Sequence, residues 1–376
     1  MKLIGLILFL PASTVPGQTA PSQDAPPAPW SIGEIKFSGL IDAYYSHNFN
    51  NPASGYNTLR NFEVRSRSFA LNMVEFSLFH DPEPIGFRLD LGFGRAWDIL
   101  HATDPGRPDI VRYFPQAYVS IKPKNWGGFQ FDFGKFYTSA GAELTENNYT
   151  WTYGRGYLYT NGPYYHMGAR VTKPLASNFT VGFQLVNGWN NVEDNNSGKT
   201  VGITTAWTGK RVSWFNNYYV GPEKNGTNRG VRNFYDTILN LNPSDKAAFY
   251  VNFDYGREGK AFGDRAAEWV AIGAAGHFQT SKRTALTLRY ENYRDQDGFI
   301  TSQRQTLNSF TVTGEYKWAG GLLSRLEYRR DWSDKPFFER GGEGSPLNIS
   351  GVPFALGPSK HQDTLTLGFV AFFGPK

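Results

Sequence analysis

The segment Ile85-Gly-Phe-Arg-Leu-Asp-Leu-Gly-Phe-Gly94 decides the fold. From its first Phe onwards, every second residue is large and apolar, and the residues between them are charged or glycine. An extended chain turns successive side chains to opposite faces, so this stretch predicts a strand with one apolar and one polar face. The same period recurs along the chain and predicts about 16 strands in all. The clearest further cases are 129–134, 179–185, 285–291, 310–316 and 363–373, and the weaker ones are 35–46, 70–79, 116–122, 165–172, 200–207, 212–220, 232–241, 249–255, 269–278 and 322–329.

The connections between these strands alternate between long and short. The long ones are 47–68, 95–111, 137–163, 187–199, 221–231, 294–307 and 331–362, with a medium one at 256–265, and a short turn separates each pair. An up-and-down antiparallel barrel in the bacterial outer membrane has short periplasmic turns and long external loops. The strands of a soluble sandwich or propeller also alternate apolar and polar residues, but these folds give no reason for connections that alternate between long and short. The sequence therefore predicts an all-β transmembrane barrel of about 16 strands.

The composition agrees with this interpretation. The 376 residues include 30 Phe, 21 Tyr and 10 Trp, which excludes a disordered chain. The absence of Cys excludes disulfide scaffolds, thiolate zinc sites, iron–sulfur clusters and cysteine nucleophiles. The mean hydropathy is −0.45, as expected when only alternate strand residues are apolar. We interpret the pI of about 9.1 as loop charge and expect no nucleic-acid partner.

The N-terminus predicts export. Met1 and Lys2 precede the apolar run 3–10, and small residues follow, as in a Sec signal peptide. An N-terminal helix of a cytosolic protein is the alternative. We expect a signal peptide over 1–17, cleaved after Gly17 or Ala20, then a Pro-rich periplasmic leader over 18–34 and a single barrel over 35–376.

The two faces of the strands predict two environments. The apolar face should meet lipid, because a closed sheet satisfies its own backbone groups there. Tyr and Trp cluster at the strand ends, where interfacial girdles are expected. The expected girdle residues are Tyr44, Tyr45, Trp207, Trp214, Tyr218, Tyr219, Tyr290, Tyr293, Tyr316, Trp318, Tyr328 and Trp332.

The polar face carries many ionisable groups, and such a lining must hold water. The expected pore-lining residues are Arg88, Asp90, Asp132, Arg170, Asp254, Arg289, Glu291, Glu315, Arg325, Glu327 and Arg329. Acidic and basic members are nearly balanced, so they predict no ion selectivity. By analogy with general porins, the third external loop folds inward, and Glu143, Glu146 and Arg155 would form a constriction. A purely external loop with solvated charges is the alternative.

Several blocks resemble the β-barrel porin family called OmpL-like or porin-2. They are Phe133-Gly-Lys-Phe-Tyr-Thr-Ser-Ala-Gly-Ala-Glu143, Asn147-Asn-Tyr149, Gly168-Ala-Arg-Val171, Leu185-Val-Asn-Gly-Trp189, Asp194-Asn-Asn196 and Lys199-Thr-Val-Gly202. The resemblance extends more loosely from about residue 37 to the C-terminus. It implies an outer-membrane porin for small hydrophilic solutes and names no substrate. Trimers are common among porins, so a homotrimer embedded in lipid and lipopolysaccharide is the expected assembly by analogy.

Three classes of function compete at this point: a transport channel, in two versions, a barrel enzyme, and a structural or adhesion barrel. The leading hypothesis is passive diffusion of small hydrophilic solutes or ions, which needs no cofactor and no metal. A substrate-selective channel, for example for sugars, is the second hypothesis, because loop 137–163 is rich in Tyr and Trp. A barrel enzyme and a structural or adhesion barrel are the others. None of the six His residues sits in a recognisable catalytic motif, so we expect no enzyme.

Overall fold

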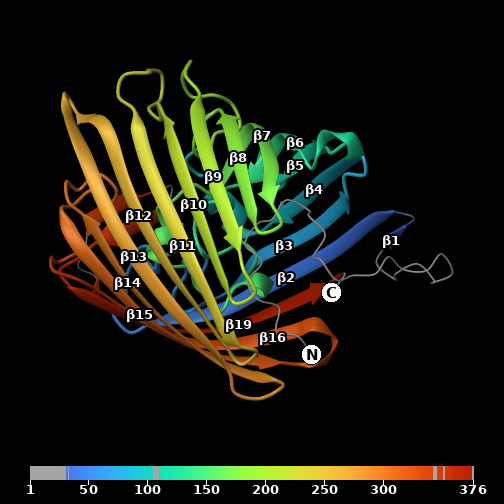
Figure 1. Ribbon diagram of the computed structural model, residues 1–376. Helices are drawn as coiled ribbons and strands as arrows, with labels where there is room; N and C mark the ends of the chain where they lie inside the picture. The colour runs from blue at the N-terminus through green and yellow to red at the C-terminus, as the bar shows by residue number, and fades with distance from the viewer. Residues whose placement is uncertain (1–30, 33, 105–109, 342–344, 350–351, 375–376) are drawn as a thin grey trace.

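Sixteen antiparallel strands close into a barrel in the computed structural model, which describes residues 31–32, 34–104, 110–341, 345–349 and 352–374 (Figure 1). Each strand pairs with its neighbours in sequence, and the last strand pairs with β2 to close the ring. The predicted barrel and all sixteen predicted strands are confirmed. The barrel strands are β2 (Ile35–Asn48), β3 (Ser68–His80), β4 (Ile85–Phe93), β5 (Ala117–Ile121), β6 (Gln130–Tyr137), β7 (Tyr165–Ala176), β8 (Phe179–Val186), β9 (Thr200–Thr208), β10 (Val212–Gly221), β11 (Arg232–Ser244), β12 (Ala247–Phe262), β13 (Arg265–Gln279), β14 (Thr284–Asp295), β15 (Gln305–Lys317), β16 (Leu322–Ser333) and β19 (His361–Phe373).

The connections keep the expected parity with one exception. The expected medium loop at 256–265 is instead a tight hairpin, because β12 and β13 continue to Phe262 and Arg265 around a two-residue turn. Gly263 has a φ of 66° there, which a glycine adopts at little cost. Both strands are therefore longer than the alternating pattern alone predicts, and with 16 and 15 residues they are the longest strands of the barrel.

Several connections contain short elements. The β4–β5 connection holds α1 (Arg95–Leu100) and η1 (Val111–Tyr113), and the loop between β6 and β7 holds η3 (Asn147–Tyr149) and α2 (Tyr157–Thr160). The turns hold η2 (Lys124–Trp126) and η4 (Ala319–Gly321), and the last long connection holds the hairpin of β17 (Ser345–Ile349) and β18 (Val352–Leu356). No helix in the described ranges is long and apolar enough to cross a membrane.

A β-bulge in β3 interrupts the alternation of its two faces. The register between β2 and β3 shifts after Asp42, which leaves Asn72 as an extra residue. Asn72 and Met73 are both buried, so both point into the barrel, whereas the alternating rule places them on opposite faces. The bulge keeps Leu71 and Phe76 on the outer surface on either side of it.

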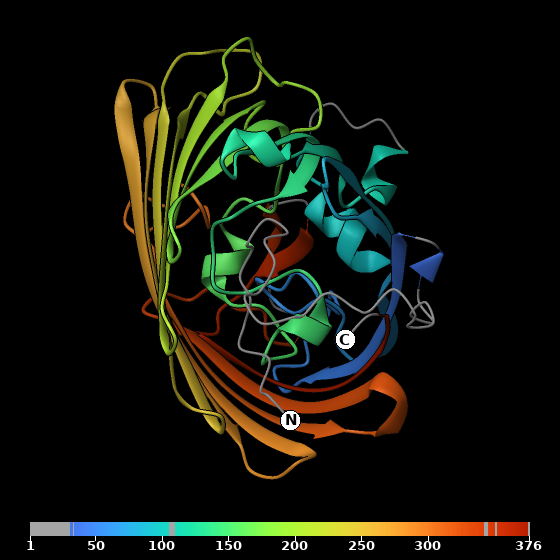
Figure 2. The same ribbon diagram turned by 45° about the vertical axis from the view of Figure 1, so that its right-hand side comes forward.

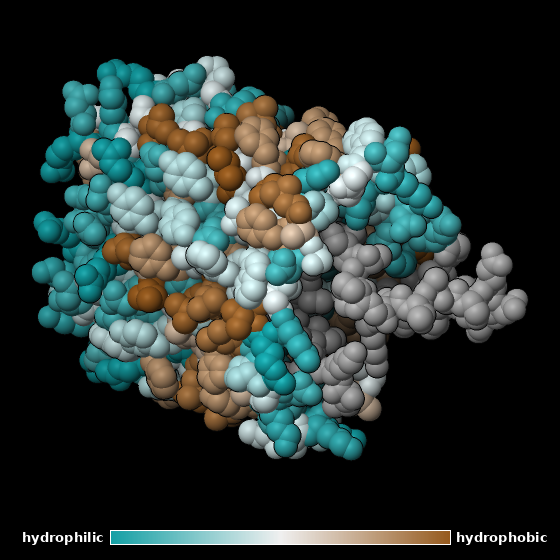
Figure 3. All heavy atoms as spheres, viewed as in Figure 1, coloured by the Kyte–Doolittle hydropathy of each residue, from teal (hydrophilic) through white to brown (hydrophobic). Residues whose placement is uncertain are grey.

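The outer surface carries an apolar band. Brown side chains cross the strands in Figure 3, and teal side chains gather at the strand ends. Exposed large residues in this band include Leu288, Phe310 and Leu367. The girdle prediction is wrong for Tyr44, Tyr219 and Tyr293, since all three are buried inside the barrel. The remaining predicted girdle residues are not among the buried ones.

This band gives a stability prediction. We expect Leu326→Arg to destabilise the folded barrel by about 2–4 kcal/mol, since Leu326 lies in the middle of β16 on the lipid-facing surface. Leu175→Arg is the matched control, because that leucine is also exposed but lies at the end of β7, where the cost is about 0–1 kcal/mol. Urea unfolding in lipid vesicles measures both costs, and equal costs would overturn the assignment of this face.

Only the end of the expected leader is described. Residues 31–32 form β1 (Ser31–Ile32), which pairs back on the start of β2 in a small antiparallel hairpin. The predicted signal peptide over 1–17 and the leader up to residue 30 lie outside the described residues. The first barrel strand, β2, begins at Ile35.

Candidate functional site: the lumen and loop L3

Residues 138–164, which connect β6 to β7 and are called loop L3 here, lie inside the barrel (Figure 2). Most of its residues are buried, and its contacts reach strands on several sides of the lumen. A polar loop can be buried only if its backbone groups find partners. The side chains that supply those hydrogen-bond partners therefore define the site.

Arg155 organises the loop from within. Its guanidinium donates to the carbonyl oxygens of Leu144 at 2.6 Å, Thr145 at 2.7 Å and Tyr153 at 2.7 Å. It also donates to Asn147 Oδ1 at 2.7 Å. One planar, permanently charged fork thus gathers both limbs of the loop, which a lysine could not do with the same geometry.

Two carboxylates of the barrel wall accept hydrogen bonds from loop L3. Glu327 accepts from the backbone N–H groups of Tyr153 at 2.6 Å and Gly154 at 2.9 Å. Asp42 accepts from the Tyr153 hydroxyl at 2.8 Å and from Asn147 Nδ2 at 2.6 Å. Bonds to a charged acceptor contribute about 1.5–3 kcal/mol each, so these contacts hold the loop firmly.

The wall arginines satisfy the loop's carbonyl groups. Arg325 donates to the carbonyl oxygens of Asn147 at 2.7 Å and Thr152 at 3.2 Å, and also to that of Thr150. Arg329 donates to the carbonyl oxygen of Arg155 at 2.6 Å. These guanidinium groups thus bind backbone dipoles as well as the acids beside them.

Arg289 connects the loop to β14. It donates to the carbonyl oxygen of Gly154 and to Thr152 Oγ1, both at 2.8 Å, and forms an ion pair with Glu143. Glu143 also accepts from the backbone N–H of Gly156 at 2.6 Å. Burial of the Arg289 side chain is complete, so its charge depends on these partners.

Two glycines allow this close approach. A Cβ on Gly156 would lie 1.9 Å from Glu291 Oε1, and a Cβ on Gly368 of β19 would lie 2.2 Å from the Tyr153 ring. No larger residue fits either position without moving the loop or the wall.

The eleven predicted pore-lining residues all face inward. Ten of them are buried, and the side chain of Arg88 is 28% exposed. They pair mainly with one another along or between strands. The pairs are Arg88 with Asp90 at 2.7 Å, Arg170 with Asp132 at 2.7 Å, Arg325 with Glu315 at 2.8 Å and Arg289 with Glu291 at 3.7 Å. Glu327 and Asp254 bind neutral donors instead.

Several charged side chains lie in the lumen besides the eleven predicted ones. Asp331 pairs with Arg329 at 2.9 Å and with Arg60 at 2.5 Å. Its position two residues after Arg329 could have shown that it shares the inward face. Arg60 and Glu63 pair at 2.9 Å and belong to the first long loop, which also enters the lumen, and no period in that loop indicates this.

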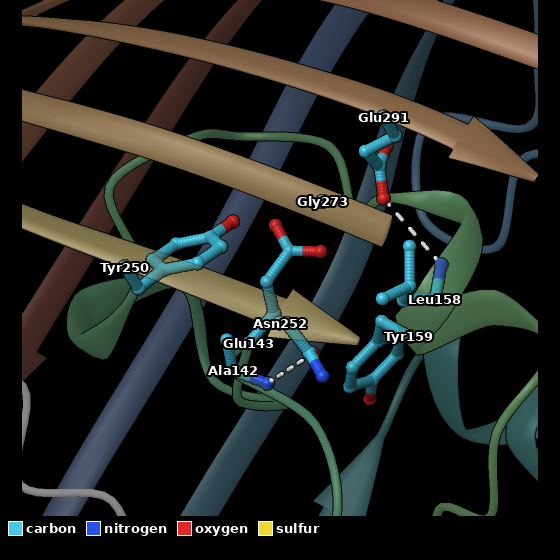
Figure 4. A pocket seen from close by; sticks show the side chains of 8 residues that line it. All are labelled: Ala142, Glu143, Leu158, Tyr159, Tyr250, Asn252, Gly273 and Glu291. Atoms are coloured by element: carbon cyan, nitrogen blue, oxygen red, sulfur yellow. Dashed lines mark hydrogen bonds between the residues drawn. The ribbon is translucent and has the colours of Figure 1, made fainter. Parts of the chain in front are cut away.

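A partly open pocket lies between loop L3 and the wall formed by β12 to β14 (Figure 4). It is lined by Ala142, Glu143, Leu158, Tyr159, Tyr250, Asn252, Gly273 and Glu291. Asn252 Oδ1 accepts from the backbone N–H of Ala142 at 2.9 Å. Both lining carboxylates lie beside the single guanidinium of Arg289.

Glu146 gives loop L3 a titratable contact. Burial, and to a smaller extent the nearby Asp90 carboxylate, raises the pKa of this carboxyl to about 7 against the opposing effects of Arg88 and Arg155. Glu75 also faces this group. The pKa of Glu146 in the folded protein is thus higher than its usual value of 4.5. The attachment of the loop is therefore strongest below pH 4.5, where the carboxyl is protonated. It weakens as the pH rises towards about 7, where Glu146 ionises.

We therefore expect the current noise of single channels to increase between pH 4.5 and 7 and then to level off. Glu146→Gln keeps the shape of the side chain but cannot ionise, so its recordings should lack this pH dependence. An identical pH profile in the parent protein and the variant would contradict this role of Glu146.

Within the part of the chain that the structure describes, no three His, Asp or Glu side chains form a group that could hold a metal ion. His101, His166 and His277 are buried in the interior. His166 hydrogen-bonds the carbonyl oxygen of Gly188 at 3.0 Å, and His277 hydrogen-bonds Thr287 Oγ1 at 2.9 Å.

A closed sixteen-stranded barrel with a charged interior and an inward loop defines the class of porin channels. Residues 34–373 match the family model described as "Putative beta-barrel porin-2, OmpL-like". The chain belongs to this family, and it is an outer-membrane porin.

Solved structures share the fold at low sequence identity. The anion-selective porin of Comamonas acidovorans has 11% identity and a TM-score of 0.57, with 90% of this chain and 99% of that chain covered. The outer membrane channel DcaP of Acinetobacter baumannii has 10% identity and a TM-score of 0.59, with 90% and 97% covered. OmpT of Vibrio cholerae has 12% identity and a TM-score of 0.59, again with 90% and 97% covered. The comparison with curated protein sequences found no match.

Proposed function

We propose that small hydrophilic solutes and ions diffuse passively through the water between loop L3 and the barrel wall. The eleven inward-facing strand residues line this path in our proposal, and Glu143, Glu146 and Arg155 set its narrowest part. The observation that carries the proposal is the attachment of loop L3 across the lumen by Glu327, Arg325 and Arg289. No cofactor takes part in this mechanism, because solutes move down their own gradients.

A liposome-swelling assay tests the role of loop L3. The parent protein should admit a small amino acid faster than a disaccharide, with entry rates that fall steeply as solute size rises. A variant in which residues 141–156 are replaced by a short Gly-Ser linker should admit both at similar rates. The same size dependence in both proteins would contradict a constriction at loop L3.

The structure offers less support for a sugar-selective channel. Tyr153 and Tyr157 of loop L3 are fully buried, and the Trp151 ring stacks with Tyr250 and His277 at centroid distances of 5.4 Å. These rings pack against the protein, so they are not free to stack on a passing sugar. Block of single-channel current by one sugar at millimolar concentration would favour the selective channel instead.

We infer that the barrel has no catalytic role. The support is that the buried His166 and His277 bind backbone or hydroxyl groups that are structural. Lipase and protease assays on the folded barrel should show no turnover above that of a heat-denatured sample, and a turnover lost on denaturation would overturn the inference.

We propose that the wall around β5 packs against other copies of the chain, as in the expected homotrimer. A membrane-spanning strand needs about 9–11 residues, whereas β5 has five. Apolar side chains are exposed on β5 and on strands near it, including Phe69, Val119 and Phe133. Lipid and lipopolysaccharide would surround the rest. Chemical cross-linking in membranes should yield dimers and trimers, and monomers alone would contradict the assembly.

We also propose that residues 1–17 form a signal peptide that is cleaved on export. N-terminal sequencing of protein extracted from outer membranes should begin at Gln18 or Pro21. An intact Met1 would contradict cleavage.

A further inference from the structure

Four consecutive short turns at one end of the barrel carry a surplus of basic residues. They join β9 to β10, β11 to β12, β13 to β14 and β15 to β16, so they are neighbours around the ring, at the end where β19 finishes (Figure 1). The bases of these turns and of the adjoining strand end, called the basic edge here, are Lys210, Arg211, Lys246, Lys282, Arg283 and Lys317. The turns span residues 209–211, 245–246, 280–283 and 318–321, and Asp245 is the only acid within them. This end of the eight strands therefore carries a net positive charge.

Backbone hydrogen bonds join the four turns into one row. The carbonyl oxygen of a basic residue accepts from the next strand along in three places: that of Arg211 from Asn242 at 2.7 Å, that of Lys246 from Gln279 at 2.8 Å and that of Arg283 from Lys317 at 2.7 Å. Neighbouring turns lie two strands apart, or roughly 10 Å along the edge. The bases thus form a continuous row and are not isolated charges.

The protein itself neutralises little of this charge. Among the described residues, Lys317 is the only base of the basic edge with an ion pair, at 3.6 Å from Glu315. Arg211 donates to the carbonyl oxygen of Asn242 at 3.3 Å, and Arg283 donates to a tyrosine hydroxyl at 3.4 Å, so both contact neutral groups. The other three, Lys210, Lys246 and Lys282, are exposed. The positive charge of the basic edge is therefore open to an anion from outside the protein.

The other end of the same strands carries mixed charges that pair with one another. Arg232 pairs with Glu258 at 2.7 Å, and Arg257 pairs with Glu268 at 3.4 Å. The surplus of bases is thus a property of the short-turn end and not of the charged residues of these strands in general.

Three aromatic pairs follow the basic edge on the outer surface. They are Trp207 opposite Trp214, Phe249 with Phe278 at a centroid distance of 5.5 Å, and Tyr316 with Trp318 at 4.7 Å. Aromatic rings gather on a membrane barrel where the hydrocarbon meets the headgroups. The basic edge therefore begins where the hydrocarbon of the bilayer ends.

The short distance from this boundary places the bases at the level of the lipid headgroups. Lys210 is three residues beyond Trp207, and three extended residues span at most about 10 Å. The headgroup layer on each side of a bilayer is roughly 5–8 Å thick. Long basic side chains bring their charges to this layer while their stems lie along apolar surface. The anions that surround a protein at this level are headgroup phosphates.

We propose that the basic edge binds the phosphate groups of anionic phospholipids in the periplasmic leaflet, which the short turns face. Each of the first three turns carries at least one base and has room for its own headgroup, so anionic lipid collects along the β9–β16 side of the barrel. Lys and Arg near an anionic membrane surface attract it about fivefold per base, the equivalent of about 1 kcal/mol. This binding does not depend on what passes through the lumen.

Spin-labelled lipids in vesicles test this proposal. The full-length barrel is folded into phosphatidylcholine vesicles that contain a trace of spin-labelled phosphatidylglycerol or of spin-labelled phosphatidylcholine. Electron paramagnetic resonance gives the fraction of each label held at the protein surface. The ratio of the two association constants should exceed one, and about 0.5 M KCl should lower it, because salt screens exposed charges. Lys210→Gln/Lys246→Gln/Lys282→Gln should lower the ratio by about two- to fivefold.

The matched control changes the same three lysines and keeps their charge. Lys210→Arg/Lys246→Arg/Lys282→Arg should retain the ratio of the parent protein. A parent ratio of one, or equal ratios in the parent protein and the glutamine variant, would overturn the proposal. Binding to purified peptidoglycan that only the glutamine variant loses, with an unchanged lipid ratio, would assign the basic edge to that polymer instead. Both variants should still show the faster gel migration of an unheated barrel, which confirms folding before the spectra are read.

Discussion

Arg325→Met is expected to lower the free energy of unfolding by about 3–5 kcal/mol, the cost of removing one partner from a buried ion pair. Arg325 is 2% exposed and pairs with Glu315 at 2.8 Å. It also donates to three carbonyl groups of loop L3. Methionine fills similar volume but leaves the acid and these carbonyl groups without their donor. Urea unfolding of the barrel in vesicles measures the change.

Two further variants serve as controls for this measurement. Arg330→Met changes the neighbouring residue, whose side chain is 47% exposed and pairs with Asp363 on the outer surface, so it should cost no more than about 1 kcal/mol. The double variant Arg325→Met/Glu315→Gln should recover part of the loss, because it no longer leaves a buried carboxylate unpaired. Equal stability of the Arg325 and Arg330 variants would show that Arg325 does not hold the loop.

Glu327→Ala is expected to loosen loop L3 without unfolding the barrel. The variant removes the bonds from Tyr153 and Gly154, which together contribute about 3–6 kcal/mol to the attachment. A loosened segment around Tyr153 and Gly154 samples positions away from the wall, so single channels should show a higher mean conductance and larger current fluctuations. Recordings in planar bilayers at 1 M KCl measure both quantities.

Glu268→Ala is the matched control for this experiment. It removes the same functional group from a strand, but Glu268 lies on the exposed rim and does not contact loop L3. Its recordings should equal those of the parent protein. If Glu327→Ala also gave unchanged conductance and noise, the wall would not be what holds the loop in place.

Much of the barrel could be predicted because a strand with two faces has a period of two. That rule places Arg289 and Glu291 on the same side and locates all sixteen strands. The same rule, applied more strictly, would have corrected the prediction of the aromatic girdle. Tyr44 lies two residues after Asp42, and Tyr293 lies two residues after Glu291, so each tyrosine shares the inward face of that acid.

The partners of these residues could not be predicted from the sequence. Arg60 meets Asp331 across 271 positions of the chain, and this contact exists only when the ring closes and the first loop enters the lumen. The inward path of loop L3 likewise depends on Glu327 and Arg325, which lie on strands far along the sequence. The bulge at Asn72 is a third example, because it follows from pairing with β2 and not from the local pattern.

We expect this barrel to conduct ions through its lumen past loop L3. The most direct measurement is the current across a planar lipid bilayer after addition of the folded, full-length protein. We predict stepwise increases of uniform size, each from the insertion of one channel unit, and larger steps when residues 141–156 of loop L3 are replaced by a short linker. A silent membrane, with protein that migrates as a folded barrel on an unheated gel, would contradict the claim.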